Sequence, residues 1–184
     1  MKRMAFAVVM LMITLPVMGQ ADIGLYGVGG QLGFVMPEDP IDNAISFGAN
    51  ADLGTIMPDL HLGASVDFWK KSYDVGFGSG SDASFSVLSI AALARYTIDI
   101  QQTFTPYVGG GLGLVIGTSS FEYTEPFSGK KVDESESDTE LGIHLLSGAR
   151  MPVTPDLDGF AELRYTLGDI DYFSILAGVS YSLK

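Results

Sequence analysis

The chain has no cysteine and few charged residues. With no Cys among 184 residues, disulfides, thiolate metal sites and a lipid-modified N-terminal cysteine are excluded. Charged side chains make up only 17% of the sequence and hydrophobic ones 47%, whereas soluble domains average about a quarter charged residues. A chain of this composition must bury its apolar surface in a core or in a membrane.

Positive charge is especially scarce. Ten Lys and Arg stand against 22 Asp and Glu, which gives a net charge of −12. Nucleic-acid phosphates are bound through clustered basic side chains. We therefore expect no nucleic-acid partner.

Long hydrophobic runs are absent except at the N-terminus. Lys2 and Arg3 precede an apolar stretch at residues 4–18, and small residues follow it up to Ala21. This order is typical of a secretory signal peptide, and the stretch is shorter than the roughly 20 residues of a spanning helix. We predict a signal peptide at residues 1–21 and one domain at 22–184, in which eight basic residues oppose 22 acidic ones, a net charge of −14.

The remaining sequence alternates between apolar and small or polar residues. In residues 44–54 one set contains Ile45, Phe47 and Leu53, and the other contains Ser46 and Asp52. A period of two sends the sets to opposite faces of a sheet. Eight such segments are predicted as strands, each long enough for a tilted membrane strand of about 9–11 residues: 23–35, 44–54, 60–71, 84–98, 106–118, 139–151, 159–168 and 172–183.

The second face of these strands is built mainly of Gly, Ser and Ala. A soluble barrel turns its polar face to water, whereas small side chains fit a narrow lumen that eight strands share. In lipid, only helices and closed barrels satisfy every backbone group. The sequence therefore predicts an all-β fold, an eight-stranded antiparallel transmembrane β-barrel. A soluble periplasmic binding barrel, which would extract without detergent, is the alternative.

Three stretches carry a family resemblance: "TPYVGGGLGLVI" at 105–116, "AELRYTLG" at 161–168 and "ILAGVSYSL" at 175–183. The chain resembles small outer-membrane barrels of the OmpX-like and OmpA-like kind over roughly 23–184. The resemblance implies a monomer in the bacterial outer membrane, in contact with lipid and lipopolysaccharide and inserted by the assembly machinery. The family's assembly signal usually ends on an aromatic residue, whereas Lys184 ends this chain.

The connections between strands indicate their direction. The longest two connections, near 72–83 and 121–138, lie at the same end of the predicted barrel. Outer-membrane barrels have short periplasmic turns and long outside loops, so both termini are expected in the periplasm. The acidic stretch 119–140 is expected to be a largely disordered outside loop, acting as a solvated cap or collecting divalent cations shared with lipopolysaccharide.

Charged residues on the lumen face form a predicted network. Pairing across the expected turns brings Asp52 near His61, His61 near Arg95 and Arg150 near Glu162. Charges in a narrow lumen must be paired, because an unpaired buried charge is very costly. The expected members of this structural network are Asp52, His61, Arg95, Tyr107, Arg150, Glu162 and Arg164.

The two histidines raise the alternative of a lipid-modifying enzyme. Such chemistry requires a nucleophile beside its base and an orienting acid, but His144 and Ser147 fall on opposite strand faces. The glycine-rich run at 109–113 lacks the Lys and helix of a phosphate loop. We therefore expect no enzyme, no cofactor and no metal site.

These observations favour an outer-membrane barrel with a structural, envelope-stabilising or surface-adhesive role and a side-chain-filled lumen. A narrow porin-like channel is the first alternative, although barrels of eight strands have interiors barely wide enough for their own side chains. A lipid-modifying enzyme is the second.

Overall fold

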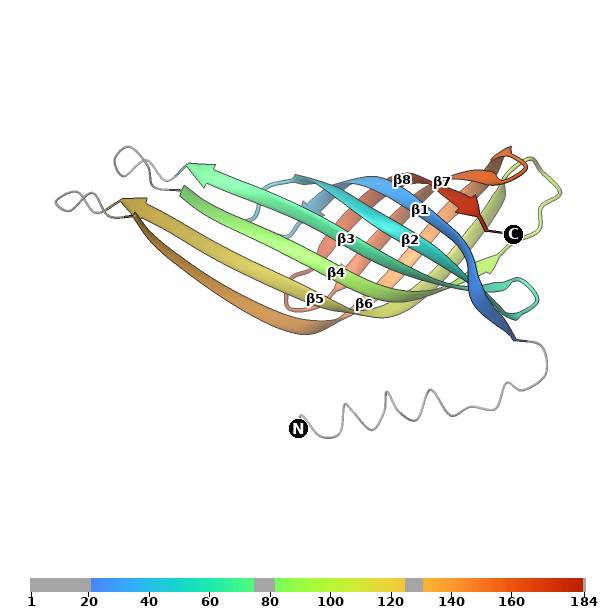
Figure 1. Ribbon diagram of the computed structural model, residues 1–184, viewed down its shortest axis with the longest axis horizontal. Helices are drawn as coiled ribbons and strands as arrows, with labels where there is room; N and C mark the ends of the chain where they lie inside the picture. The colour runs from blue at the N-terminus through green and yellow to red at the C-terminus, as the bar shows by residue number, and fades with distance from the viewer. Residues whose placement is uncertain (1–20, 75–81, 125–130, 184) are drawn as a thin grey trace, which may run out of the picture.

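The protein folds as a closed ring of antiparallel strands. The structure, a computed structural model, describes residues 21–74, 82–124 and 131–183. Each strand pairs with the next and β1 pairs with β8 (Figure 1). The predicted all-β, eight-stranded antiparallel barrel is confirmed. Its strands are β1 (Asp22–Pro37), β2 (Ala44–Met57), β3 (Leu60–Asp74), β4 (Asp82–Thr97), β5 (Thr105–Thr124), β6 (Lys131–Thr154), β7 (Leu157–Leu167) and β8 (Tyr172–Ser182).

The predicted signal peptide lies outside the described residues, apart from Ala21. The described residues contain no helix that is long and apolar enough to cross a membrane. Both ends of the barrel domain lie at the end of the ring opposite the longest hairpins (Figure 1).

The outside of the ring is apolar. Leu32, Ile45 and Ile23 are more than 60% exposed, and Ile45 and Phe47 of the apolar set in residues 44–54 face outward as predicted, whereas Leu53, beside a register shift, is half-buried. An ordinary soluble protein does not expose so large a contiguous apolar surface, so lipid is its natural surrounding. Further exposed side chains include Phe34, Phe47, Val66, Ile90, Leu112, Leu114, Leu141, Ile143, Leu145, Leu163, Ile175 and Val179.

An apolar cluster fills the lumen near the end with the longest hairpins. We call it the outer plug; its buried members are Val35, Ala44, Trp69, Val87, Val115 and Tyr172. Trp69 packs against Phe85 and Tyr172, with ring centroids 5.7 and 6.0 Å away. Elsewhere in the lumen a second apolar cluster of Ala91, Leu93, Tyr107 and Leu146 lies beside buried polar side chains. The barrel is therefore filled by its own side chains.

The acidic stretch 119–140 is the main departure from the predicted elements. Apart from residues 125–130, which lie outside the described part, it is strand: β5 continues to Thr124 and β6 begins at Lys131, with unbroken pairing from Thr105↔Arg150 to Thr124↔Lys131. A hydrogen bond of 2.9 Å joins the hydroxyls of Thr118 and Ser137 across it. Its sequence is mostly polar, and between Glu134 and Glu140 β6 carries only acidic and hydroxyl side chains. This part of β6 therefore lacks the apolar alternation by which the other strands were found.

Candidate functional site

Arg164 on β7 is the centre of the charged lumen. It is only 3% exposed, and its guanidinium donates to Glu162 Oε1 at 2.6 Å and to Asp67 Oδ2 at 2.7 Å. A further bond of 3.1 Å reaches Ser65 Oγ. Ser65 and Asp67 belong to β3, so Arg164 ties opposite walls of the barrel together. The planar guanidinium fits this role because its donors point in several fixed directions.

Glu162 extends this network toward the other end of the lumen. Its Oε2 accepts hydrogen bonds from Arg95 Nε at 3.1 Å and from the Tyr107 hydroxyl at 3.0 Å, and the Arg95 guanidinium lies over the Tyr107 ring, 5.7 Å from its centroid. Glu162 is 1% exposed, so its charge depends on these partners instead of water.

Glycines on neighbouring strands make room for two large members, Arg95 and Tyr107. A Cβ atom at Gly63 would lie 2.7 Å from Arg95 Nη1, and one at Gly148 would lie 2.7 Å from the Tyr107 hydroxyl. The small residues of the lumen face therefore fit the charged ones. At Gly63 and Gly148 a larger residue would collide with the network.

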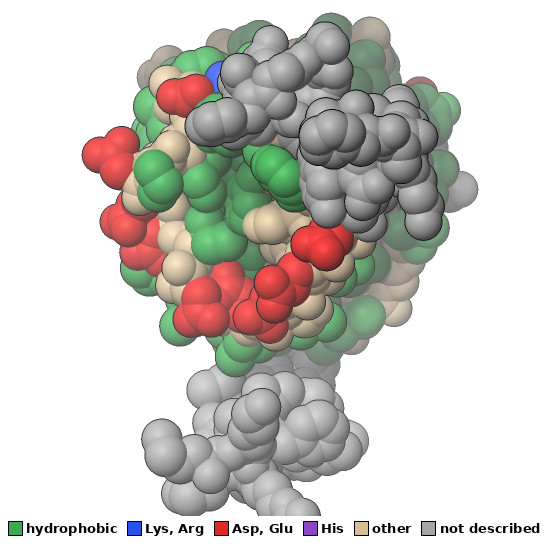
Figure 2. Space-filling view, turned by 90° about the vertical axis from the view of Figure 1, so that its left-hand side faces the viewer, with side chains coloured by type: hydrophobic (Ala, Val, Ile, Leu, Met, Phe, Trp, Pro, Cys, Tyr) green, Lys and Arg blue, Asp and Glu red, His purple; other side chains and the backbone are tan. Residues whose placement is uncertain are grey.

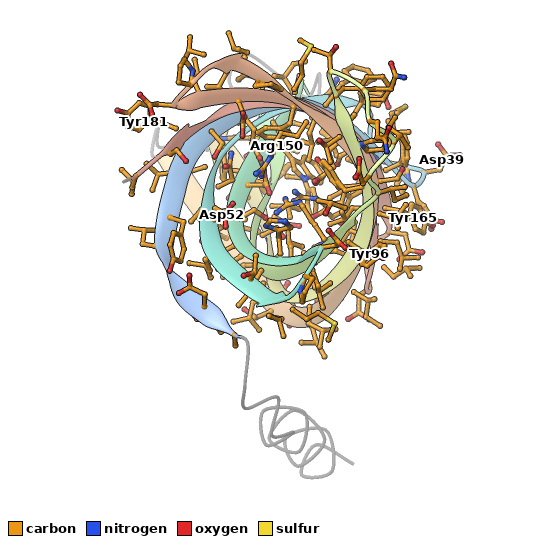
Figure 3. All side chains as sticks on the ribbon, turned by 90° about the vertical axis from the view of Figure 1, so that its right-hand side faces the viewer. Asp39, Asp52, Tyr96, Arg150, Tyr165 and Tyr181 are labelled. Carbon is orange, nitrogen blue, oxygen red and sulfur yellow. The ribbon has the colours of Figure 1, made fainter. Side chains whose placement is uncertain are left out.

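Asp52 and Arg150 form a separate pair at the end where both termini lie. Arg150 Nη1 is 3.5 Å from Asp52 Oδ2 and 4.0 Å from Asp158 Oδ2. Viewed from that end, Asp52 and Arg150 point into the lumen, whereas Tyr96, Tyr165 and Tyr181 lie around the outside (Figure 3). This pair is partly exposed, unlike the pairs of Arg164.

The register differs from the expected one at two places. Glu162 lies opposite Gly148, so Arg150 does not pair with it. Asp52 lies opposite Gly63 and not His61, because the β2–β3 turn falls at Pro58 and Asp59, with Met57 opposite Leu60.

His61 stands directly opposite Arg95. It lines one small cavity together with Asp52, Arg95, Tyr107 and Arg150.

Sequence reasoning missed the polar residues at the middle of the lumen. Gln31 donates a short hydrogen bond to Asp67, and Asn50 donates to Gln31 at 3.4 Å. The sequence could have indicated Asp67, because Asp67 falls on the same face of its strand as His61. Gln31 carries no charge, so the search for charged residues on the lumen face did not find it.

His144 and Ser147 lie on opposite faces of β6. His144 is fully buried, and its Nδ1 lies 3.0 Å from the Thr166 hydroxyl. Ser147 lies on the exposed outer face. Within the described part of the chain, no group of three or more His, Asp or Glu side chains is placed to hold a metal ion.

Enclosed space along the lumen is small. The cavity beside His61 and Arg150 measures about 20 Å³, and that beside Trp69 and Arg164 about 10 Å³. Such volumes hold about one water molecule each.

A closed ring with an apolar exterior and a lumen filled with paired charges defines the class of transmembrane β-barrels. The family model described as "Outer membrane protein beta-barrel domain" matches residues 5–182. The chain belongs to this family, and the protein is an outer-membrane β-barrel. No protein of curated function matches it significantly.

Solved structures share the fold. Neisserial surface protein A superposes with a TM-score of 0.64 at 22% identity, over 88% of this chain and 99% of that one. Ail, the attachment invasion locus protein of Yersinia pestis, gives 0.57 at 20% identity in its complex with the heparin analogue sucrose octasulfate, over 86% and 97%. A major outer membrane protein from Thermus thermophilus gives 0.51 at 13% identity, over 87% and 100%.

Proposed function

We propose that this protein is a non-conducting barrel that stabilises the envelope and holds a surface-exposed sheet for adhesion. The observation that carries the proposal is the contrast between the two parts of the molecule. The lumen is occupied by the outer plug and by the ion pairs of Arg164, whereas the longest strands, β5 and β6, extend beyond the ring.

The filled lumen supports a structural role over transport. An ion crossing the barrel would have to displace Trp69 and break the bonds of Arg164 to Asp67 and Glu162. A buried pair that loses one partner leaves an uncompensated charge, at a cost of about 3–5 kcal/mol. We therefore propose that the seven-residue network predicted from sequence acts structurally.

An adhesive role has support from the relatives' names. One similar structure is a surface protein and another is the product of an attachment invasion locus. The displayed hairpins of this chain supply the exposed area that such a role needs.

The orientation follows from the same contrast. Outer-membrane barrels place long connections outside and short turns in the periplasm, so we propose that both termini are periplasmic and that residues 1–21 are removed during export.

The closed ring leaves no unpaired strand within the lipid, which supports a monomer. The exterior would contact lipid and lipopolysaccharide after insertion by the assembly machinery.

Conductance in planar bilayers tests the proposal. The purified protein should show no discrete conductance steps, because the plug and ion pairs fill the lumen. Reproducible steps that persist when the hairpin of β5 and β6 is shortened would instead establish the narrow channel. We also propose that the protein is not an enzyme; lipid turnover abolished by His144→Ala would contradict this.

A further inference from the structure

An open groove lies on the inner face of the strands, beyond the outer plug. We call the strand segments 119–124 and 131–140 the extension. The groove measures about 920 Å³, and residues of β4, β5 and β6 line it. Small-molecule sites have volumes of about 300–1,000 Å³. The groove therefore has the size of a site for a small organic ligand.

The strand register arranges aromatic and acidic side chains in two adjacent rows across this groove. In the first row, Phe121 on β5 lies directly opposite Glu134 on β6. In the second row, Ser119 on β5 lies between Phe85 on β4 and Glu136 on β6. All five lie on the same face of their strands as the buried lumen positions. Because residues opposite each other have Cβ atoms about 4.5–5.5 Å apart, one ligand can touch a ring and a carboxylate together.

The two phenyl rings give the groove an apolar surface. Phe121 is 42% exposed although it belongs to the polar extension, and it faces inward, away from the surrounding lipid. Phe85 packs against Trp69 of the outer plug, with ring centroids 5.7 Å apart. Burial of exposed aromatic surface against a ligand is favourable, so the rings favour a ligand with an apolar part.

Glu134 and Glu136 give the groove its charge. Among the side chains that the structure describes, neither carboxylate forms an ion pair. The two residues are two positions apart on one face of β6, which corresponds to about 7 Å, and like charges at this distance repel each other. Figure 2, viewed onto this end, shows acidic side chains around a largely hydrophobic mouth. A cation in the groove would relieve the repulsion, whereas an anion would increase it.

We propose that this groove binds small organic cations that carry an aromatic or apolar group, such as aryl-alkyl amines and guanidines. The cationic head lies between Glu134 and Glu136, and its N–H groups donate to these carboxylates and to the Ser119 hydroxyl. The apolar part covers Phe85 and Phe121, and a cation over the Phe121 ring is attracted by its π face. The inference goes beyond the proposed display role and does not depend on it.

Three matched probes test the two halves of this ligand chemistry. 4-Phenylbutylamine carries both the charge and the ring, 4-phenylbutan-1-ol lacks the charge, and n-butylamine lacks the ring. The full barrel, folded in phosphatidylcholine vesicles, is dialysed to equilibrium against each probe, and empty vesicles measure the partition into lipid. We expect 4-phenylbutylamine to bind about tenfold more tightly than either of the other two probes.

Trp69 provides a second, independent measurement. It is the one tryptophan of the chain, and it contacts Phe85, which lines the groove. The fluorescence of Trp69 should therefore change on addition of 4-phenylbutylamine and saturate over the concentrations at which dialysis shows binding. The alcohol at the same concentrations should leave the emission unchanged.

Variants of the groove provide the matched comparison. Glu134→Gln combined with Glu136→Gln removes both charges at nearly constant size, and we expect about tenfold weaker binding. The control combines Glu38→Gln with Asp39→Asn, which removes two charges from the β1–β2 loop outside the groove and should change binding by less than about twofold. Phe121→Ser should weaken binding about threefold. Each variant should keep the heat-modifiable migration of a closed barrel.

Several results would overturn the inference. Equal binding of 4-phenylbutylamine and the alcohol would reveal only an apolar recess, and equal binding of 4-phenylbutylamine and n-butylamine only an acidic surface. Equal losses in the two double variants would show attraction by the general charge of this end. Uptake no greater than that of empty vesicles would show that the groove binds none of the probes. A conducting lumen would refute the proposed function and leave these measurements valid.

Discussion

At the residue scale, the lumen combines ion pairs of very different burial. Glu162 and Arg164 are almost fully enclosed, and each has several partners. Asp52 and Arg150 have side chains 20% and 32% exposed. Burial, more than the distance between charges, determines how much each pair matters, because water screens the exposed pair.

Glu162→Gln should strongly destabilise the barrel. The substitution leaves Asp67 as the one carboxylate partner of Arg164 among the described residues and leaves Arg95 without a carboxylate partner, so we expect a loss of about 3–5 kcal/mol. Equilibrium unfolding by urea from lipid vesicles measures this loss. The control Asp52→Asn should cost about 0–1 kcal/mol, because its pair is partly solvated. Equal losses in both variants would contradict the central role of Glu162.

At the element scale, β6 passes from lipid to water along its length. Leu145 is 53% exposed and lies on the outer face in the ring. Ser135 is exposed on the same side of the same strand but belongs to the extension. Residues 134–140 belong to the part of β6 that has left the apolar band.

An arginine introduced at Leu145 should change the unfolding free energy far more than one introduced at Ser135. Leu145→Arg places a charge against lipid and should cost about 2–4 kcal/mol. Ser135→Arg places it in water and should change the unfolding free energy by less than about 0.5 kcal/mol. Urea unfolding from vesicles compares the two variants. A large cost at Ser135 would mean that the extension is embedded in lipid.

At the scale of the whole molecule, closure of the ring makes the barrel a single cooperative unit. β1 and β8 pair from Gly27↔Ser182 to Pro37↔Tyr172, so no strand within the ring can detach without breaking ladders on both sides. The backbone must also remain paired throughout the lipid.

Heat-modifiable migration on a gel should report this closure. The unheated protein in dodecyl sulfate should run as a compact species and shift after boiling, because the closed ladder resists the detergent until heated. Extraction from membranes should require detergent. Release by salt washing alone would contradict the membrane assignment.

The sequence by itself determined the fold class, the strands within lipid and most of the lumen charges. It could do so because lipid outside and a narrow lumen inside impose strict alternation on every strand, visible from Ile45 to Leu53. Beyond the apolar band that constraint ends, so the sequence of the strands at 119–124 and 131–140 predicted a disordered acidic loop instead.

Only the tertiary structure decided which charges meet. Local turns predicted Arg150 beside Glu162, but the observed register brings Arg150 to Asp52, and ring closure brings Arg164 on β7 to Asp67 on β3. Such contacts cross the lumen between strands far apart in the chain. They depend on the tilt and stagger of the whole barrel, which no single hairpin specifies.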